Sequence, residues 1–235
     1  MDKKVKTAVI LAGGKGTRMR EHPIALPKPM VEIGGKPVLV HIMDYLNSFQ
    51  KFKFIICTGY MEEIIFDYFE KNIYPNVTIL PTGDETQTGG RIKQVEEYVD
   101  TDFLMTYGDG LADVDIGKLI DSHITSQKTA TLSVNKPVLR FGLVNFDKEG
   151  EVDSFVEKPT LNYYVNIGFM IFTPKIFDFI PEDIPFENEP LVNLASAKEL
   201  NAFKHEGYFK PMDTYREYLD LNDLWNSGKA PWKVD

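Results

Sequence analysis

The sequence contains a single cysteine, Cys57, among its 235 residues. One thiol can form neither an intrachain disulfide nor a zinc site that requires several thiolates. Cys57 ends the apolar run at residues 54–57, which is typical of a cysteine that packs as a small hydrophobic side chain. We therefore expect Cys57 to be a buried core residue and not a nucleophile.

Histidine is also scarce, with four residues in the chain. These are His22, His41, His123 and His205. Their spacing matches no metal site, and none has an obvious nucleophile as a partner in the sequence. We expect each to be structural or on the surface.

Positive charge is scarce relative to negative charge. The chain has 26 lysines and arginines against 35 aspartates and glutamates, which gives a formal net charge of −9. A diffuse negative field repels phosphate, so we expect neither nucleic acid nor an anionic membrane as a partner. Any phosphate-binding site must be local and rich in cations.

Long apolar runs are absent as well. No segment approaches the ~20 consecutive apolar residues of a membrane span. Lys3, Lys4 and Lys6 precede the apolar residues 8–12, as in a secretory signal, but this run is short and leads into glycines instead of a cleavage pattern. We expect a cytoplasmic location.

The chain has neither internal repeats nor a low-complexity linker, and we expect one domain over residues 1–235. Apolar runs of strand length alternate with segments of helical periodicity, which predicts an α/β fold. The predicted strands are residues 7–11, 53–58, 77–80, 102–107, 129–135 and 166–173, with a hairpin over 144–156 whose turn is 147–150. The predicted helices are residues 38–49, 61–71, 90–99, 116–127 and 215–225.

A glycine-rich segment, residues 13–18, directly follows the first predicted strand. Gly13, Gly14 and Gly16 allow a tight turn that presents N–H groups to phosphate oxygens, while Lys15 and Arg18 add positive charge. The spacing matches neither Gly-x-x-x-x-Gly-Lys-Ser/Thr nor Gly-x-Gly-x-x-Gly, and prolines after the loop disfavour the helix that both motifs require. The residues alone leave two interpretations, a plain tight turn and a flexible loop over a triphosphate.

Three further residues lie in settings suited to phosphate or metal binding. Lys28 is bracketed by Pro27 and Pro29, which restrict its backbone, although a solvated loop lysine is the commoner outcome for such a residue. Asp109 lies between two glycines at the end of a predicted strand, and Asp213 follows a proline and a methionine. Such carboxylates suit magnesium held by few protein ligands and by phosphate oxygens, with a turn aspartate as the alternative for each.

Several motifs, taken together, resemble those of the sugar-1-phosphate nucleotidyltransferases. They are residues 11–18 (Leu-Ala-Gly-Gly-Lys-Gly-Thr-Arg), 27–30 (Pro-Lys-Pro-Met), 108–110 (Gly-Asp-Gly), 157–159 (Glu-Lys-Pro) and Asp213. Residues 31–37, 82–84, 88–91, 106–110, 189–191 and 229–232 resemble more closely the members of that family that use CTP and glucose 1-phosphate. The resemblance covers nearly the whole chain, and the set is specific although each motif alone is weak.

The resemblance implies a Rossmann-like three-layer sandwich with a mixed, mainly parallel central sheet. It also implies a cytidylyltransferase that joins CMP from CTP to a phosphorylated small molecule, a sugar 1-phosphate such as glucose 1-phosphate, and releases pyrophosphate with Mg²⁺ as cofactor. The implied nucleotide-binding residues are Leu11, Ala12, Gly13, Gly14, Thr17, Arg18, Lys28, Thr82, Gly89, Arg91 and Asp109, of which Arg18, Lys28 and Asp109 have catalytic roles. The implied metal ligands are Asp109 and Asp213. The implied acceptor-binding residues are Glu157, Lys158, Asn166 and Ile167. A homo-oligomer is compatible with the family.

Two departures from the family pattern concern the acceptor. The segment between residues 69 and 77 is shorter than expected, and Asn166-Ile167-Gly168 stands where Asn-Gly-Gly is expected. The branched Ile167 adds bulk if it faces the ligand, whereas it has no such effect if it points into the core. A second acceptor therefore stays open, a phosphorylated glutamine that would give CDP-glutamine for capsular phosphoramidate synthesis.

Two other classes of function are weaker interpretations. A non-catalytic nucleotide-binding regulator would keep the glycine loop but lose the metal ligands, and the presence of Asp109 and Asp213 argues against it. A nicotinamide-dependent oxidoreductase is disfavoured by the glycine spacing and by the prolines that follow it.

Overall fold

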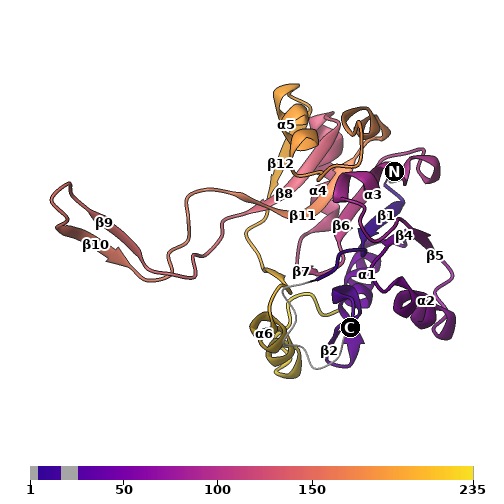
Figure 1. Ribbon diagram of the computed structural model, residues 1–235, viewed down its shortest axis with the longest axis horizontal. Coiled ribbons are helices and arrows are strands. Elements are labelled where there is room, and N and C mark those ends of the chain that lie inside the picture. Colours follow the sequence, from indigo (N-terminus) through magenta and orange to yellow (C-terminus); the bar gives the residue numbers. More distant parts are fainter. Residues whose placement is uncertain (1–4, 17–25, 235) are drawn as a thin grey trace.

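The computed structural model of the chain describes residues 5–16 and 26–234. At its centre lies a seven-stranded sheet with the strand order β12-β8-β11-β6-β1-β4-β5 (Figure 1). Strand β1 (Thr7–Leu11) runs parallel to β4 (Lys53–Thr58) on one side and to β6 (Phe103–Tyr107) on the other. The carboxyl ends of β1 and β6 therefore lie next to each other.

The outer strands make the sheet mixed. Strand β5 (Val77–Pro81) runs parallel to β4. On the opposite side β11 (Val165–Phe172) runs antiparallel to both β6 and β8 (Ala130–Asn135), and β12 (Leu200–Lys204) runs parallel to β8 at the edge. Only β11 is reversed, so the sheet is mainly parallel, as predicted.

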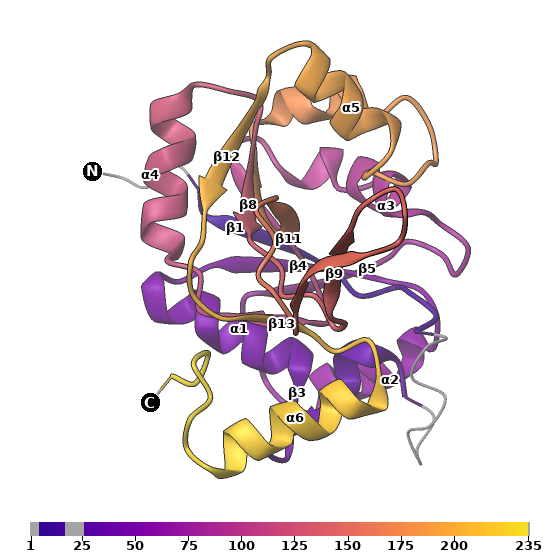
Figure 2. The same ribbon diagram turned by 90° about the vertical axis from the view of Figure 1, so that its left-hand side faces the viewer.

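Helices cover both faces of the sheet (Figure 2). Side chains alternate along β1, so that Ala8 and Ile10 pack into one hydrophobic cluster and Val9 and Leu11 into the other. Helices α1 (Val38–Phe49), α2 (Glu62–Lys71) and α4 (Ile116–Ser126) contribute to the first cluster, and α3 (Thr88–Lys93), the 3₁₀ helix η4 (Pro174–Phe179) and α5 (Glu189–Ser196) contribute to the second. The predicted three-layer sandwich is confirmed.

Aromatic packing holds the reversed strand in place. Phe103 of β6 lies opposite Phe172 of β11 in the ladder, and their ring centroids are 5.6 Å apart in an edge-to-face arrangement. Such a pair adds roughly 0.5–1.5 kcal/mol beyond the burial of its apolar area. This contact helps to fix β11, which carries Asn166 and Ile167, beside β6, which leads to Asp109.

The cysteine and the described histidines have the structural places that were expected of them. Cys57 is fully buried, and burial raises the pKa of its thiol to about 12, so the thiol stays protonated. His41, His123 and His205 are buried as well. His22 lies outside the described residues.

A short second ladder connects distant parts of the chain. Strand β7 (Gly110–Ala112) pairs antiparallel with β13 (Phe209–Pro211), with Gly110 opposite Pro211. Helix α6 (Tyr215–Asn226) follows β13 and packs near the small hairpin of β2 (Glu32–Ile33) and β3 (Lys36–Pro37). The ladder therefore places the start of α6 beside the loop after β6.

A hairpin arm, residues 137–161, projects from the body of the protein (Figure 1). It contains β9 (Leu143–Phe146) and β10 (Val152–Val156), which pair antiparallel as predicted. At its base the N–H of Leu139 donates to the carbonyl of Pro159 at 3.0 Å, and the N–H of Leu161 donates to that of Pro137 at 2.9 Å. These two bonds join the strands of the arm where it leaves the body.

The predicted long elements are confirmed with boundaries that differ by one or two residues, and one prediction is wrong. The helix expected over residues 90–99 begins earlier, ends at Lys93 and is followed by a 3₁₀ turn, η3 (Glu96–Tyr98). The elements missed were β2, β3, β7, β12, β13, α5, η4 and η2 (Lys28–Met30), most of which are too short to show a period. No helix among the described residues is both long and apolar enough to span a bilayer.

Candidate active site

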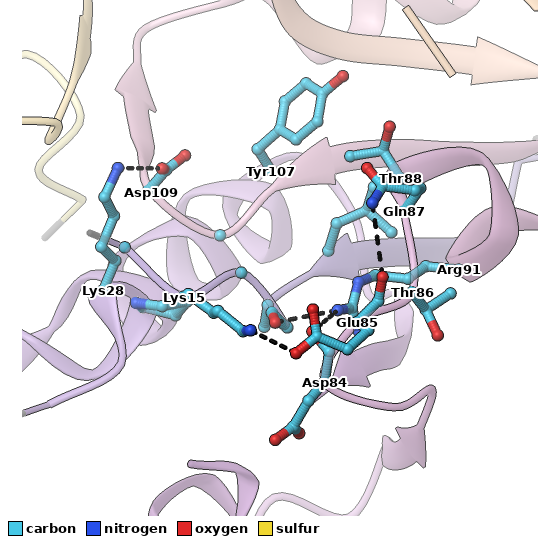
Figure 3. Close-up of a pocket in the computed structure, with 17 residues that line it drawn as sticks. Lys15, Lys28, Asp84, Glu85, Thr86, Gln87, Thr88, Arg91, Tyr107 and Asp109 are labelled. Atoms are coloured by element: carbon cyan, nitrogen blue, oxygen red, sulfur yellow. Dashed lines mark hydrogen bonds and ion pairs between the residues drawn. The ribbon is translucent and has the colours of Figure 1, made fainter. Parts of the chain in front are cut away.

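A cavity of about 400 Å³ lies at the carboxyl ends of β1 and β6 (Figure 3). We call it the loop cavity; it is lined by residues 11–16, 28–29, 84–88, 91 and 107–109. The N–H of Gly108 donates to the carbonyl of Leu11 at 2.9 Å, so the loops after the two strands touch. The chain leaves β1 towards β4 on one side and later enters β6 on the other, which is the switch point where open α/β sheets bind ligands.

Arg91 of α3 holds the glycine loop from behind. Its guanidinium is buried and donates to the carbonyl of Gly13 at 3.0 Å, to the carbonyl of Thr58 at 2.8 Å and to Oγ1 of Thr82 at 2.5 Å. A Cβ at Gly13 would lie 2.0 Å from Nη1 of Arg91, so a side chain there would displace the guanidinium. Arg91 thus fixes the loop against the wall that residues 82–88 form.

The structure brings most of the predicted nucleotide-binding residues to this cavity. Leu11, Ala12, Gly13, Gly14, Lys28, Arg91 and Asp109 line it. Thr82 and Gly89 are buried behind its wall, where the N–H of Gly89 donates to the carbonyl of Ile184 at 2.9 Å. Thr17 and Arg18 lie outside the described residues.

An ion pair crosses the mouth of the loop cavity. Lys15 of the glycine loop pairs with Glu85, and both side chains are exposed (Figure 3). The hydrogen bond to Glu85 and its negative charge raise the pKa of Lys15. Because Lys15 lies at the edge of the cavity, its ammonium is available to an anionic ligand that enters there.

Lys28 lies between the two predicted metal ligands. Its Nζ is 3.2 Å from Oδ2 of Asp109 and 2.5 Å from Oδ1 of Asp213. Lys28 is 8% exposed, so the commoner outcome for a lysine between two prolines, a solvated side chain, is not observed. Three residues from η2, from the end of β6 and from the end of β13 therefore meet at one point.

The ladder of β7 and β13 produces this meeting point. Asp109 precedes β7, Asp213 follows β13, and the N–H of Met212 donates to the carbonyl of Asp109 at 2.8 Å. Two partly exposed carboxylates beside the loop cavity match a divalent cation that takes its other ligands from phosphate oxygens and water. The described part of the chain has no cluster of three or more His, Cys, Asp or Glu side chains suited to a metal.

Glu217 holds Asp213 in place and was not identified from the sequence. Its Oε2 accepts from the N–H groups of Asp213 and Thr214, both at 2.9 Å, while Oγ1 of Thr214 accepts from the N–H of Glu217 at 3.3 Å. This reciprocal capping begins α6. The spacing Thr-x-x-Glu at residues 214–217 is the local signal that could have identified it.

A second cavity of about 480 Å³, the central groove, opens on the other side of Asp109. It is lined by residues 106–107, 109–110, 166–168, 187, 191, 209, 211 and 213. Asn166 lies on its wall, and Ile167 borders it although its side chain is 3% exposed and packs mainly in the core. Asp109 is therefore shared by the loop cavity and the central groove.

The central groove continues into a larger hollow of about 730 Å³, the basic groove, which shares Ile167, Phe209 and Pro211 with it. The cations that line the basic groove are Lys136, Arg140, Lys158, Lys210 and Arg216. Lys158 has the left-handed φ of 47°, an uncommon backbone state for a lysine, and its Nζ is 3.8 Å from the exposed Glu157. Three of the predicted acceptor residues, Lys158, Asn166 and Ile167, therefore line connected grooves that lead to Asp109, whereas Glu157 lines neither groove.

A model of the nucleotidyl transferase family matches residues 7–211 of the chain. The chain belongs to the nucleotidyl transferase family. The matched residues contain the glycine loop, Lys28, Asp109 and Lys158, and they end two residues before Asp213.

Curated relatives of this nucleotidyl transferase match along nearly the whole chain. Glucose-1-phosphate cytidylyltransferase from Salmonella typhimurium is 46% identical over 254 residues, which cover 97% of this chain and 98% of the relative. The probable glucose-1-phosphate cytidylyltransferase from Bacillus subtilis is 39% identical over 252 residues, with 97% and 99% covered. Both alignments exceed the 235 residues of this chain, so both relatives contain residues that it lacks.

A solved structure of similar fold is that of HddC from Yersinia pseudotuberculosis complexed with GMP-PN. It has a TM-score of 0.73 and 29% sequence identity, with 94% of this chain and 100% of that chain covered. The nucleotidyl transferase fold of the present chain is thus supported by a family model, by sequence relatives and by a structure.

We predict that Arg91→Lys weakens both the fold and nucleotide binding. Arg91 reaches the carbonyls of Gly13 and Thr58 with two separate nitrogens of its planar guanidinium, which the single nitrogen of a lysine does not reproduce, so we expect at least one buried carbonyl to lose its charged donor. We expect a loss of roughly 2 kcal/mol in the free energy of unfolding and a higher Kd for CTP. Denaturant unfolding and calorimetric titration measure the two effects.

Lys93→Arg is the matched control. It makes the reverse exchange, from lysine to arginine, on the same helix, and Lys93 lies outside the loop cavity. It should leave CTP affinity unchanged. Native stability and native CTP affinity in Arg91→Lys would show that the glycine loop does not depend on the guanidinium.

Proposed function

We propose that the chain transfers CMP from CTP to a sugar 1-phosphate, most simply glucose 1-phosphate, with release of pyrophosphate and formation of a CDP-sugar. The observation that carries the proposal is the convergence of Lys28, Asp109 and Asp213 between a glycine-lined cavity and a cation-lined groove. The names of the relatives from Salmonella typhimurium and Bacillus subtilis support both CTP and glucose 1-phosphate.

We assign one substrate to each of two cavities, the loop cavity and the central groove. The triphosphate lies in the loop cavity, where glycine N–H groups and Lys15 face its oxygens. The acceptor lies in the central groove with its phosphate towards Asp109, one of the two residues that line both cavities. An oxygen of the acceptor phosphate then attacks the α-phosphorus while the bond to the pyrophosphate oxygen breaks.

Charge neutralisation and alignment are the chemical tasks of this site. The acceptor phosphate is already an anionic nucleophile, so the reaction requires no general base, and aligning two substrates contributes about 7 kcal/mol or more to lowering the barrier. Asp109 and Asp213 would hold Mg²⁺, which neutralises charge on the phosphates when bound. Lys28, buried beside both carboxylates, offers its ammonium to oxygens of the triphosphate.

The basic groove supports a phosphorylated acceptor. Five cations line it in a chain whose net charge is −9, while Glu217 and Asp220, which also line it, each pair with one of those cations. Lys158 is the cation that the family resemblance assigns to the acceptor phosphate. The relatives act on sugar phosphates according to their names, which favours a sugar 1-phosphate over phosphoglutamine as the acceptor.

Self-association through the hairpin arm is part of the proposal. Among the described residues, most of the large hydrophobic side chains that are exposed lie between residues 138 and 165, including Phe141, Phe146 and Phe155. A two-stranded hairpin is marginally stable alone, and so much exposed apolar surface marks a protein contact. We assign this contact to a second copy of the chain, because that copy is present wherever the chain itself is present.

The test of the reaction is pyrophosphate release with ATP, CTP, GTP and UTP against a panel of acceptors that includes glucose 1-phosphate and phosphoglutamine. We expect the highest kcat/KM with CTP and a sugar 1-phosphate, and loss of turnover when a chelator removes divalent cations. Equal rates with UTP and CTP, or activity that resists the chelator, would contradict the proposal.

Asp109→Asn serves as the inactive reference for this assay. The amide keeps the size of the side chain but removes its charge, so turnover should fall by about 10²-fold or more if the bound metal supplies several kcal/mol of transition-state stabilisation. Asp121→Asn, an equivalent change at an exposed position of α4, should remain fully active. Native circular dichroism is required of both variants.

Lys158→Ala should affect the acceptor and not CTP, because Lys158 lines the basic groove and lies outside the loop cavity. Loss of one charge-assisted phosphate contact, worth about 1.5–3 kcal/mol, should lower kcat/KM for the acceptor by roughly 10 to 150-fold. Lys148→Ala removes the same charge from the turn of the same arm and should behave as the unmodified chain. A rise in the Kd of CTP without any acceptor effect would refute the assignment.

Self-association can be measured by sedimentation velocity at micromolar concentration. We expect an oligomer for the unmodified chain and a smaller species for the double variant Phe146→Ser and Phe155→Ser, whose two rings are more than 60% exposed on the arm. Lys148→Ala should sediment as the unmodified chain. A monomer at every concentration would disprove this part of the proposal.

A further inference from the structure

Residues 183–187 are bound to the start of α3, beside the loop cavity. The N–H of Gln87 donates to Oδ1 of Asp183 at 2.8 Å, and the N–H of Phe186 donates to Oγ1 of Thr88, also at 2.8 Å. Gln87 and Thr88 line the loop cavity. The segment at 183–187 therefore supports the cavity wall from outside, although the family resemblance gave it no role.

Glu187 links this wall to the central groove. Its Oε2 accepts from the hydroxyl of Thr88 at 2.7 Å, and its Oε1 accepts from the hydroxyl of Tyr107. Thr88 belongs to the loop cavity, whereas Glu187 itself lines the central groove. One carboxylate thus holds two hydroxyl groups that come from α3 and from the end of β6.

Tyr107 lies between the two substrate sites. It lines both the loop cavity and the central groove, and it immediately precedes Gly108 and Asp109. Its hydroxyl donates a hydrogen bond to Oε1 of Glu187. Figure 3 shows Tyr107 in the view between Asp109 and Thr88.

The ring of Tyr107 rests on the backbone of β11. Gly168 has a φ of 88°, and a Cβ there would lie 2.5 Å from Cδ2 of Tyr107, so the ring occupies the space that a side chain would fill. Gly168 follows Asn166 and Ile167, and the N–H of Gly168 donates to Oδ1 of Asn166 at 3.0 Å. The position of the ring therefore shapes the wall of the groove that contains Asn166.

We propose that Glu187 is a positioning residue that sets the place of the acceptor relative to bound CTP by holding Tyr107 and Thr88 together. This inference rests on the proposed cytidylyl transfer and gives Glu187 a role in it that acts through Tyr107. In this proposal the bound nucleotide contacts residues 86–88 and so holds Thr88 in place. The carboxylate of Glu187, to which Thr88 and Tyr107 both donate, then holds Tyr107 in place. Loss of the link leaves each substrate able to bind but poorly aligned with the other.

The experiment compares Glu187→Ala with Glu187→Gln and Tyr107→Phe. Glu187→Ala should raise the acceptor KM and lower kcat, with kcat/KM for the acceptor falling roughly 10-fold or more, while the Kd of CTP measured without acceptor changes less than about 3-fold. Glu187→Gln should restore most of the activity, because its amide oxygen can accept from Tyr107 while its NH₂ donates to Thr88. Tyr107→Phe should reproduce Glu187→Ala, and combining the two should add little further loss.

Glu189→Ala is the matched control, since it removes a carboxylate two residues away that accepts a hydrogen bond from Asn193 on its own helix. It should leave both substrates unaffected. If Glu187→Ala fails to fold, the Tyr107→Phe variant with intact Glu187 still decides the question through its acceptor KM.

Two results would overturn the inference. If Glu187→Ala weakens CTP binding but leaves the acceptor KM unchanged, Glu187 only braces the wall of the loop cavity. If the double variant loses the product of the two single effects, Glu187 and Tyr107 act independently. A lack of cytidylyl transfer by the unmodified chain would instead refute the proposed function, so the two failures are distinguishable.

Discussion

The ladder between β7 and β13 is the contact on which the active-site geometry depends. Only three residue pairs form it, yet it places Asp213 beside Asp109, which lies over a hundred residues earlier in the chain. Two carboxylates at such close range repel each other, and Lys28 from a third segment lies between them. The pairing of β7 with β13 thus brings two negative charges together, and the buried ammonium of Lys28 offsets their repulsion. The same pairing forms the place where the loop cavity and the central groove meet.

The elements that the sequence predicts well are those that are long enough to show a pattern of their own. Strand β1 is a continuous apolar run, helix α1 has apolar residues at helical spacing, and the bounds of both agree with the predicted ranges. The strands of two or three residues, including β7 and β13, contain too few positions for any period to show. Their existence depends on partners far away in the chain, which a single sequence does not display.

The same distinction, between a local pattern and contacts with distant residues, decides which site residues could be predicted. The glycine loop and Asp109 follow predicted strands, so their meeting at the edge of the sheet could be inferred from local patterns. The burial of Lys28 could not, because flanking prolines restrict the backbone without indicating what surrounds the side chain. Glu217 gave a local capping signal, whereas Glu187 gave none, since both of its hydrogen-bond donors are about eighty or more residues distant.

The arm has a consequence for how such chains can diverge. Two backbone hydrogen bonds join its strands at the base, and the hairpin beyond them packs on itself and not on the sheet. Residues can therefore be gained or lost in the outer part of the arm without shifting β8 or β11 in their ladder. The sheet therefore does not constrain the length of the arm, and relatives with the same residues at its base can differ in how far the arm extends from the body.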